Sequence, residues 1–158
     1  DLSGTSGASG VAIGVTGRQN ADATGHSTNN KGKKMGDRAN FGIKQHNGHT
    51  IVIYGHWAGW EMLHHFAVAL KTAKDAGRIY DESYAARIIF DSLTEGSDPL
   101  LGWGITVDCI QDNEHKVPVF DVDSQTVSLY DCGCSFNLDN PIFTMSVDGF
   151  ISKFLKQG

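Results

Sequence analysis

The sequence lacks several features that define common classes of protein. It has no apolar run close to the roughly 20 residues that a membrane-spanning helix needs. Its start, Asp1-Leu2-Ser3-Gly4, has neither the basic residues nor the apolar stretch of a signal peptide, and the missing initiator Met indicates processing or a tag. With 40% hydrophobic residues, the 158-residue chain is expected to be a soluble globular protein with no membrane association.

Cysteine is also scarce. The chain has three cysteines, whereas a small secreted protein held by disulfides usually has an even number at higher density. Cys109, Cys132 and Cys134 are therefore predicted to be reduced thiols, as in a cytoplasm. Together with His115 they could supply four zinc ligands, but the paired spacing of a zinc site is missing. Buried or idle thiols are the preferred interpretation, and neither a metal site nor a cofactor is expected.

Acidic and basic residues are unevenly distributed along the chain. Residues 1–34 carry four basic and two acidic side chains, a net charge of +2, whereas residues 35–158 carry 9 basic and 16 acidic side chains, a net charge of −7. An acidic domain repels phosphate backbones, so no nucleic-acid binding by residues 35–158 is expected.

The same boundary separates two compositions. Residues 1–34 contain seven glycines and no aromatic residue, so they cannot bury enough apolar surface to offset the entropy lost on ordering. We interpret this segment as a Gly-rich, low-complexity arm, which is an appendage, a tag or an assembly arm. Residues 35–158 are interpreted as a single α+β domain.

Apolar periodicity within the domain predicts strands and helices in a definite order. Two strands at 40–45 and 50–54 are joined by Asn47-Gly48, a strong hairpin signal. Two helices follow, and the later elements are strands at 104–110, 117–122 and 126–130, a short strand-like segment at 142–145, and a helix that begins after Ser146. This order predicts an α+β fold: a mainly antiparallel sheet of about five strands, with two central helices and a C-terminal helix packed on one face.

Four blocks of sequence resemble a group of small uncharacterised proteins of tailed bacteriophages, mostly of actinobacteria. The blocks are Gly36-Asp37-Arg38-Ala39-Asn40, Tyr54-Gly55-His56-Trp57-Ala58-Gly59, Asp81-Glu82-Ser83-Tyr84-Ala85-Ala86-Arg87-Ile88-Ile89-Phe90 and Asp112-Asn113-Glu114-His115. The resemblance covers residues 36–129 and implies a phage setting, with the host cytoplasm as the expected location and the virion as the alternative. It implies no particular activity.

The candidate site consists of Asp37, Arg38, Tyr54, His56 and Trp57. In an antiparallel hairpin the segment before the first strand lies beside the end of the second, so Asp37 and Arg38 should meet His56 on one rim. Arg38 would then bind a phosphate and Trp57 would stack on a base, while His56 could exchange protons near neutral pH. The structural alternative is an Asp–Arg pair, a capping histidine and a core tryptophan.

No complete catalytic motif supports an enzyme. The sequence has no Gly-x-Ser-x-Gly elbow, phosphate-binding loop or His-x-x-x-His helix pair. The preferred hypothesis is a non-enzymatic phage accessory protein that binds a host or phage partner protein, or a small anionic ligand such as a nucleotide. One alternative is a virion component, a homo-oligomer whose arm orders against neighbouring subunits. Another is a small hydrolase that uses His56 and Asp37.

Deleting residues 1–34 tests the division of the chain. We expect residues 35–158 to keep the melting temperature and far-UV circular dichroism of the full chain, because the arm can bury little apolar surface. Thermal melting and size-exclusion chromatography measure stability and assembly. Loss of an oligomer with folding retained would favour the virion alternative, whereas loss of folding would contradict the division.

Overall fold

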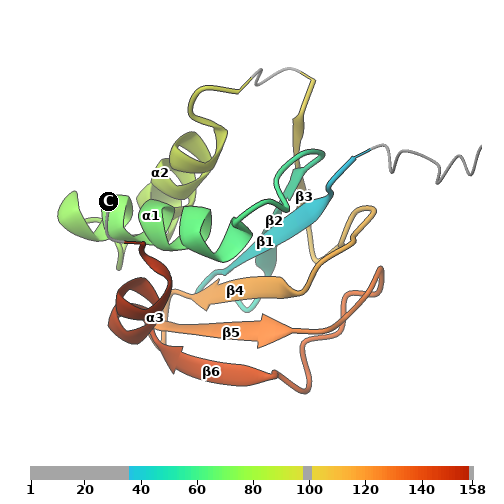
Figure 1. The fold of residues 1–158 in the computed structure, drawn as a ribbon. Helices are drawn as coiled ribbons and strands as arrows, with labels where there is room; N and C mark the ends of the chain where they lie inside the picture. Colours follow the sequence, from blue (N-terminus) through green and yellow to red (C-terminus); the bar gives the residue numbers. More distant parts are fainter. Residues whose placement is uncertain (1–35, 98–100, 157–158) are drawn as a thin grey trace, which may run out of the picture. The chain divides into compact units, whose positions relative to one another are not determined.

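Three helices and a sheet of six strands make up the part of the chain that this computed structural model describes, residues 36–97 and 101–156 (Figure 1). The strands are β1 (Ala39–Lys44), β2 (Thr50–Gly55), β3 (Trp103–Val107), β4 (Val117–Asp121), β5 (Thr126–Tyr130) and β6 (Phe143–Ser146). The helices are α1 (Met62–Asp75), α2 (Glu82–Thr94) and α3 (Val147–Phe154). The predicted α+β class is confirmed, while the Gly-rich arm of residues 1–34 lies outside the described residues.

The sheet is mixed, with the strand order β3-β2-β1-β4-β5-β6. Four of its neighbouring pairs are antiparallel, and β1 pairs with β4 in parallel. The prediction of about five mainly antiparallel strands therefore needs a small correction. A parallel pair requires a long crossover, and here β2, α1, α2 and β3 lie between the two strands in the sequence.

Local signals in the sequence produce the expected turns and helix ends. The Asn47-Gly48 hairpin is confirmed, and Gly48 adopts a left-handed φ of 83°, which glycine tolerates because it has no Cβ. At the start of α2 the Asp81 carboxylate accepts a hydrogen bond from the Tyr84 backbone N–H at 3.5 Å. At the start of α3 the Ser146 hydroxyl accepts one from the Gly149 backbone N–H at 3.1 Å.

Phe66 on α1 lies at the centre of the main core. α1 lies between α2 and α3 (Figure 1), and its apolar face packs against the sheet. The Phe66 ring lies 5.5 Å from the Phe41 ring on β1 and 6.0 Å from the Phe150 ring on α3, measured between centroids. All three side chains are fully buried, so Phe66 joins the sheet to the C-terminal helix.

A smaller apolar cluster covers the opposite face of the sheet. Val119 on β4 packs beside Gly42 on β1, whose missing side chain leaves the space that Val119 occupies. A Cβ at position 42 would lie only 2.8 Å from a Val119 methyl group. Successive residues of a strand face opposite sides, so Phe41 and Gly42 belong to different layers.

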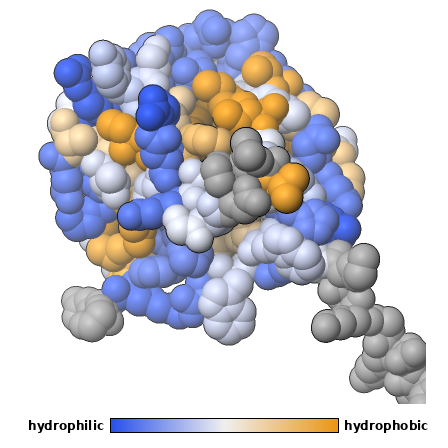
Figure 2. Space-filling model, turned by 90° about the horizontal axis from the view of Figure 1, so that it is seen from above, coloured by the Kyte–Doolittle hydropathy of each residue, from blue (hydrophilic) through white to orange (hydrophobic). Residues whose placement is uncertain are grey.

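None of the described helices is long and apolar enough to cross a membrane. α1, the longest helix in the described ranges, has 14 residues, short of the roughly 20 that a spanning helix needs. On the face shown in Figure 2, hydrophobic residues form patches bordered by hydrophilic residues.

Phe66→Ala tests the central role of this ring. Removing a fully buried phenylalanine leaves a cavity between sheet and helices, so we expect the free energy of unfolding to fall by about 3–5 kcal/mol. Urea denaturation measures the change. Tyr80→Ala is the control: Tyr80 is 72% exposed, and its loss should change stability by no more than about 0.5 kcal/mol. Equal effects of the two substitutions would contradict this description of the core.

Candidate functional site

Three segments of the chain meet at one edge of the sheet. Since β1 and β4 are parallel, the segments that lead into them lie at the same edge, and the antiparallel β2 ends there. Backbone hydrogen bonds join the three segments: Asp37 N–H to the His56 carbonyl (3.0 Å), Gly59 N–H to the Asp37 carbonyl (2.9 Å) and Glu114 N–H to the Arg38 carbonyl (3.1 Å). The edge is therefore a connected structure and not a set of independent loops.

The side chain of Asn40 holds the loop before β4 in place. Asn40 is fully buried on β1, and its amide nitrogen donates to the Gln111 carbonyl (2.9 Å) and to Asn113 Oδ1 (3.1 Å). Its Oδ1 accepts a hydrogen bond from the Gln111 backbone N–H (3.1 Å). Burying an amide without hydrogen-bond partners costs free energy. The loop therefore stabilises the buried Asn40 side chain, and Asn40 in turn holds the loop in place. Glu114 and His115 follow directly and are held against the start of β1.

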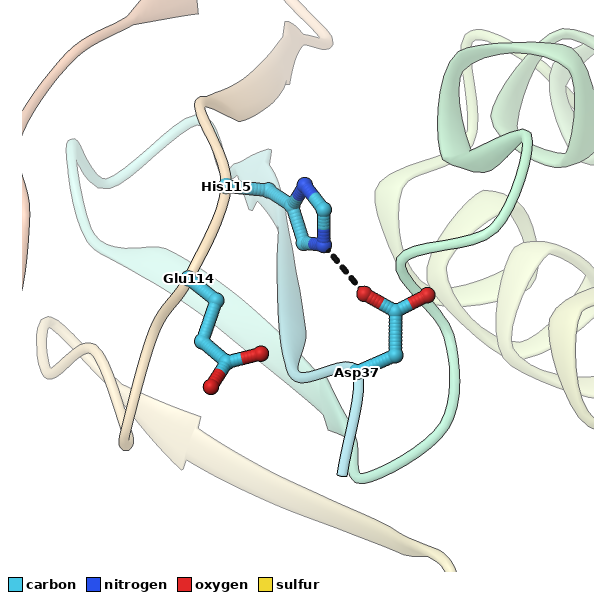
Figure 3. Close-up of side chains that lie close together, drawn as sticks. All are labelled: Asp37, Glu114 and His115. Atoms are coloured by element: carbon cyan, nitrogen blue, oxygen red, sulfur yellow. Dashed lines mark hydrogen bonds and ion pairs between the residues drawn. The ribbon is translucent and has the colours of Figure 1, made fainter. Parts of the chain in front are cut away.

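Asp37, Glu114 and His115 converge at this edge. His115 Nε2 lies 2.5 Å from Asp37 Oδ1, and one ligand atom from each of the three residues lies within 4.8 Å of the other two. Figure 3 shows Asp37, from the segment before β1, facing Glu114 and His115, from the segment before β4. All three residues are half-buried. In the described ranges they are the one group of histidine, cysteine and carboxylate side chains placed to hold a metal ion. We call them the metal cluster.

Gly59 lies directly against the metal cluster. A Cβ at this position would lie 2.1 Å from His115 Nε2 and 2.2 Å from Asp37 Oδ1, distances that no side chain could keep. A side chain here would force the His115 and Asp37 side chains to move, so Gly59 leaves the space in which these two side chains meet.

Arg38 balances part of the negative charge. Its Nε lies 3.0 Å from Asp112 Oδ2 and its Nη1 lies 3.4 Å from Glu114 Oε1. The guanidinium thus orients Glu114, and its charge is shared between two carboxylates. The carboxylates of Asp37, Asp112 and Glu114 outnumber the one guanidinium at this edge, so its electrostatic character is acidic.

A pocket of about 470 Å³ opens beside the metal cluster, which is large enough for a small ligand. Glu114 and His115 both line it, so an ion at the cluster would be reachable from the pocket. The remaining lining residues are Met62, Leu63, Asn113, Lys116, Leu129, Asp131 and Gly133.

The structure divides the five residues of the sequence-predicted site between two surroundings. Asp37, Arg38 and His56 do share one rim, as the hairpin geometry predicted. The His56 ring instead belongs to an aromatic row: the Tyr54 hydroxyl lies 3.1 Å from His56 Nδ1, and the Trp57 ring packs edge-on against His56 at 4.8 Å. Trp57 is 65% exposed, so the alternative of a core tryptophan is wrong.

Sequence reasoning missed Glu114 and His115 as partners of Asp37. The sheet predicted from the sequence was mainly antiparallel, and that arrangement gave no reason to place the loop before β4 beside the start of β1. Two signals could have found them: an asparagine inside the apolar strand β1, and a polar run between Ile110 and Val117. A buried asparagine needs polar partners, and a polar run of this kind can supply them.

None of the three cysteines belongs to the metal cluster, although Cys134 Sγ lies 3.9 Å from the carbonyl of Asn113, the residue before Glu114. All three are free thiols; Cys109 and Cys134 are exposed, while Cys132 is half-buried in the smaller apolar cluster. Burial raises the pKa of the Cys132 thiol, which disfavours the thiolate that metal binding requires.

Comparison with known proteins gives no relative to argue from. No protein-family model matches the sequence, and neither the curated proteins nor the solved structures contain a significant match.

Asn40→Ala tests whether this amide holds the site together. The substitution removes the hydrogen bonds that the buried Asn40 amide makes with Gln111 and Asn113, so we expect a loss of about 1–3 kcal/mol in the free energy of unfolding. Urea denaturation measures the loss. Asn140→Ala removes an exposed asparagine and is expected to change stability by at most about 0.5 kcal/mol. If both variants were equally stable, Asn40 would not have the role assigned to it.

Proposed function

We propose that this domain is a non-enzymatic binding module for a divalent transition-metal cation, held by Asp37, Glu114 and His115. The observation that supports it is the convergence of one imidazole and two carboxylates within 4.8 Å at the rim of an open pocket. One nitrogen and two oxygen donors suit Zn²⁺ and related first-row ions. Ligand atoms around a tetrahedral ion with bonds of about 2.1 Å lie about 3.4 Å apart, so small side-chain rotations would complete the site.

Charge favours a cation over the small anionic ligand expected from the sequence. Arg38, the residue expected to bind phosphate, is already engaged by Asp112 and Glu114. Lys116, also on the pocket wall, lies 4.0 Å from the Asp131 carboxylate. The net charge of −7 on residues 35–158 adds a general attraction for cations.

A His–Asp pair alone would not support a metal site, because this chain contains others. His49 Nδ1 lies 2.6 Å from Asp108 Oδ2, and His46 also pairs with Asp123. Neither pair belongs to the metal cluster, the one such group of ligands among the described residues. What distinguishes the His115–Asp37 pair is the second carboxylate, Glu114, and the adjoining pocket.

A metal-dependent hydrolase is the second candidate. Three protein ligands leave coordination positions open, and the pocket beside the metal cluster would admit a substrate. A metal ion in such a site lowers the pKa of a bound water to about 7 and so provides a nucleophile. The hydrolase predicted from the sequence paired Asp37 with His56. The hydrolase proposed here pairs Asp37 with His115, because the Asp37 carboxylate is hydrogen-bonded to the His115 imidazole. Ester or phosphoester hydrolysis that depends on added metal and on His115 would favour it.

The biological setting follows from the resemblance to phage proteins and stays a prediction. The proposed role is that of a phage accessory protein in the host cytoplasm, with a host or phage protein as a further partner. The virion alternative, with homo-oligomers and an ordered arm, concerns residues 1–34, which lie outside the described residues.

Isothermal titration calorimetry with ZnCl₂ tests metal binding on the full chain after treatment with EDTA. We expect one saturable site. Changing residues that only support a metal ligand typically weakens binding about 10- to 100-fold, so His115→Gln, which removes a ligand, should weaken it at least that much.

His49→Gln is the matched control, since it disrupts a second His–Asp pair that has no third ligand. Its zinc affinity should equal that of the unmodified protein. Equal affinity of the His115→Gln and unmodified proteins would contradict the assignment. Thermal melting gives an independent measure, because an ion that binds only the folded state at about 100 times its Kd stabilises it by about 2.7 kcal/mol.

A further inference from the structure

The three tryptophans of the chain gather around one pocket. Trp57, Trp60 and Trp103 all line a hollow of about 210 Å³. The other lining residues are Phe41, Ala58, His65, Ser92, Leu93 and Glu95. None of them belongs to the metal cluster, so this aromatic pocket is separate from the proposed metal site.

The aromatic side chains are available to a ligand. Trp57 is 65% exposed and Trp60 is 72% exposed, although tryptophan is highly buried on average. Phe41, in contrast, is fully buried, and its ring centroid lies 6.4 Å from that of Trp103. Exposed tryptophans beside a buried ring form a surface that is apolar and rich in π-electrons.

Specific contacts hold two of these tryptophans in position. The His56 ring packs edge-on against Trp57 at 4.8 Å, and the Tyr54 hydroxyl lies 3.1 Å from the same imidazole. The Trp103 indole N–H donates to the Ser97 hydroxyl at 2.9 Å. Trp103 also packs against Gly55, where a Cβ would lie only 2.8 Å from the indole ring. A ligand would therefore meet walls that are already positioned, which reduces the entropic cost of binding.

The electrostatics of the aromatic pocket favour positive charge. Glu95 is the one acidic residue among the described residues that line it, and lysine and arginine are missing from the same set. Glu95 is also the C-cap of α2, and the last turn of α2, which is fully described, contains no basic residue. A helix C-terminus carries partial negative charge, so it adds to the carboxylate.

We propose that the aromatic pocket binds a methylated or quaternary ammonium group. Tryptophan faces attract such cations through cation–π interactions, and an adjacent carboxylate adds to that attraction. The volume of 210 Å³ lies below the about 300–1,000 Å³ of pockets for drug-sized ligands, which suits a compact headgroup. An unmethylated ammonium group is more strongly hydrated and is a poorer guest.

Intrinsic tryptophan fluorescence of the full chain tests this proposal by titration with tetramethylammonium and choline. EDTA in the buffer removes metal ions, and the titration is carried out at a pH of about 8. We expect saturable quenching by both cations. The neutral isostere of choline, in which carbon replaces the charged nitrogen, should bind at least about 10-fold more weakly. Comparing the affinities for choline and trimethyllysine then shows whether the pocket prefers the ammonium group of a choline-type molecule or that of a methylated lysine side chain.

Two variants assign binding to the aromatic pocket. Trp60→Leu and Glu95→Gln should each weaken it about 5- to 30-fold. Tyr80→Leu is the control, because Tyr80 is as exposed as Trp60, at 72%, and does not line the pocket. Circular dichroism checks folding, and Glu95→Gln decides the test if Trp60→Leu fails to fold. Equal binding of the neutral isostere, no saturable change with either cation, or unchanged affinity in the variants would overturn the proposal.

Discussion

The parallel pairing of β1 with β4 determines which parts of the chain meet at the metal cluster. Parallel strands place their leading segments at one edge of a sheet, so Asp37 and the Glu114–His115 pair become neighbours. If β4 ran antiparallel to β1, these residues would lie at opposite edges. The buried Asn40 depends on the same pairing, because its hydrogen-bond partners lie in the loop that leads into β4.

The two proposed sites differ in chemistry, but both would favour a positively charged ligand. The metal cluster provides an imidazole and two carboxylates, which suit a small, strongly polarising ion. The aromatic pocket provides indole faces and one carboxylate, which suit a large, weakly hydrated cation. The rim from Asp37 to Trp57 connects them, since Arg38 and His56 both lie beside Gly36. An acidic domain favours both ligands through its long-range field.

Sequence reasoning succeeded where the causes are local. The turn at Asn47-Gly48 and the caps at Asp81 and Ser146 depend on neighbouring residues, and the structure contains all three. The meeting of Asp37 with His56 followed from hairpin geometry. Which strand pairs with β1 on the side away from β2 depends on packing across the whole domain. No local sequence pattern predicts that pairing. For that reason the parallel pair and the contact of His115 with Asp37 were not predicted, and the exposure of Trp57 was left open.

Anomalous X-ray diffraction from crystals grown with zinc tests the central claim most directly, because it locates the ion. We expect one strong anomalous peak about 2.0–2.2 Å from side-chain atoms of Asp37, Glu114 and His115, with a water or small ligand on the pocket side. The Asn40 side chain should remain hydrogen-bonded to the loop before β4. A zinc peak beside His49 and Asp108, with none at the metal cluster, would contradict the assignment.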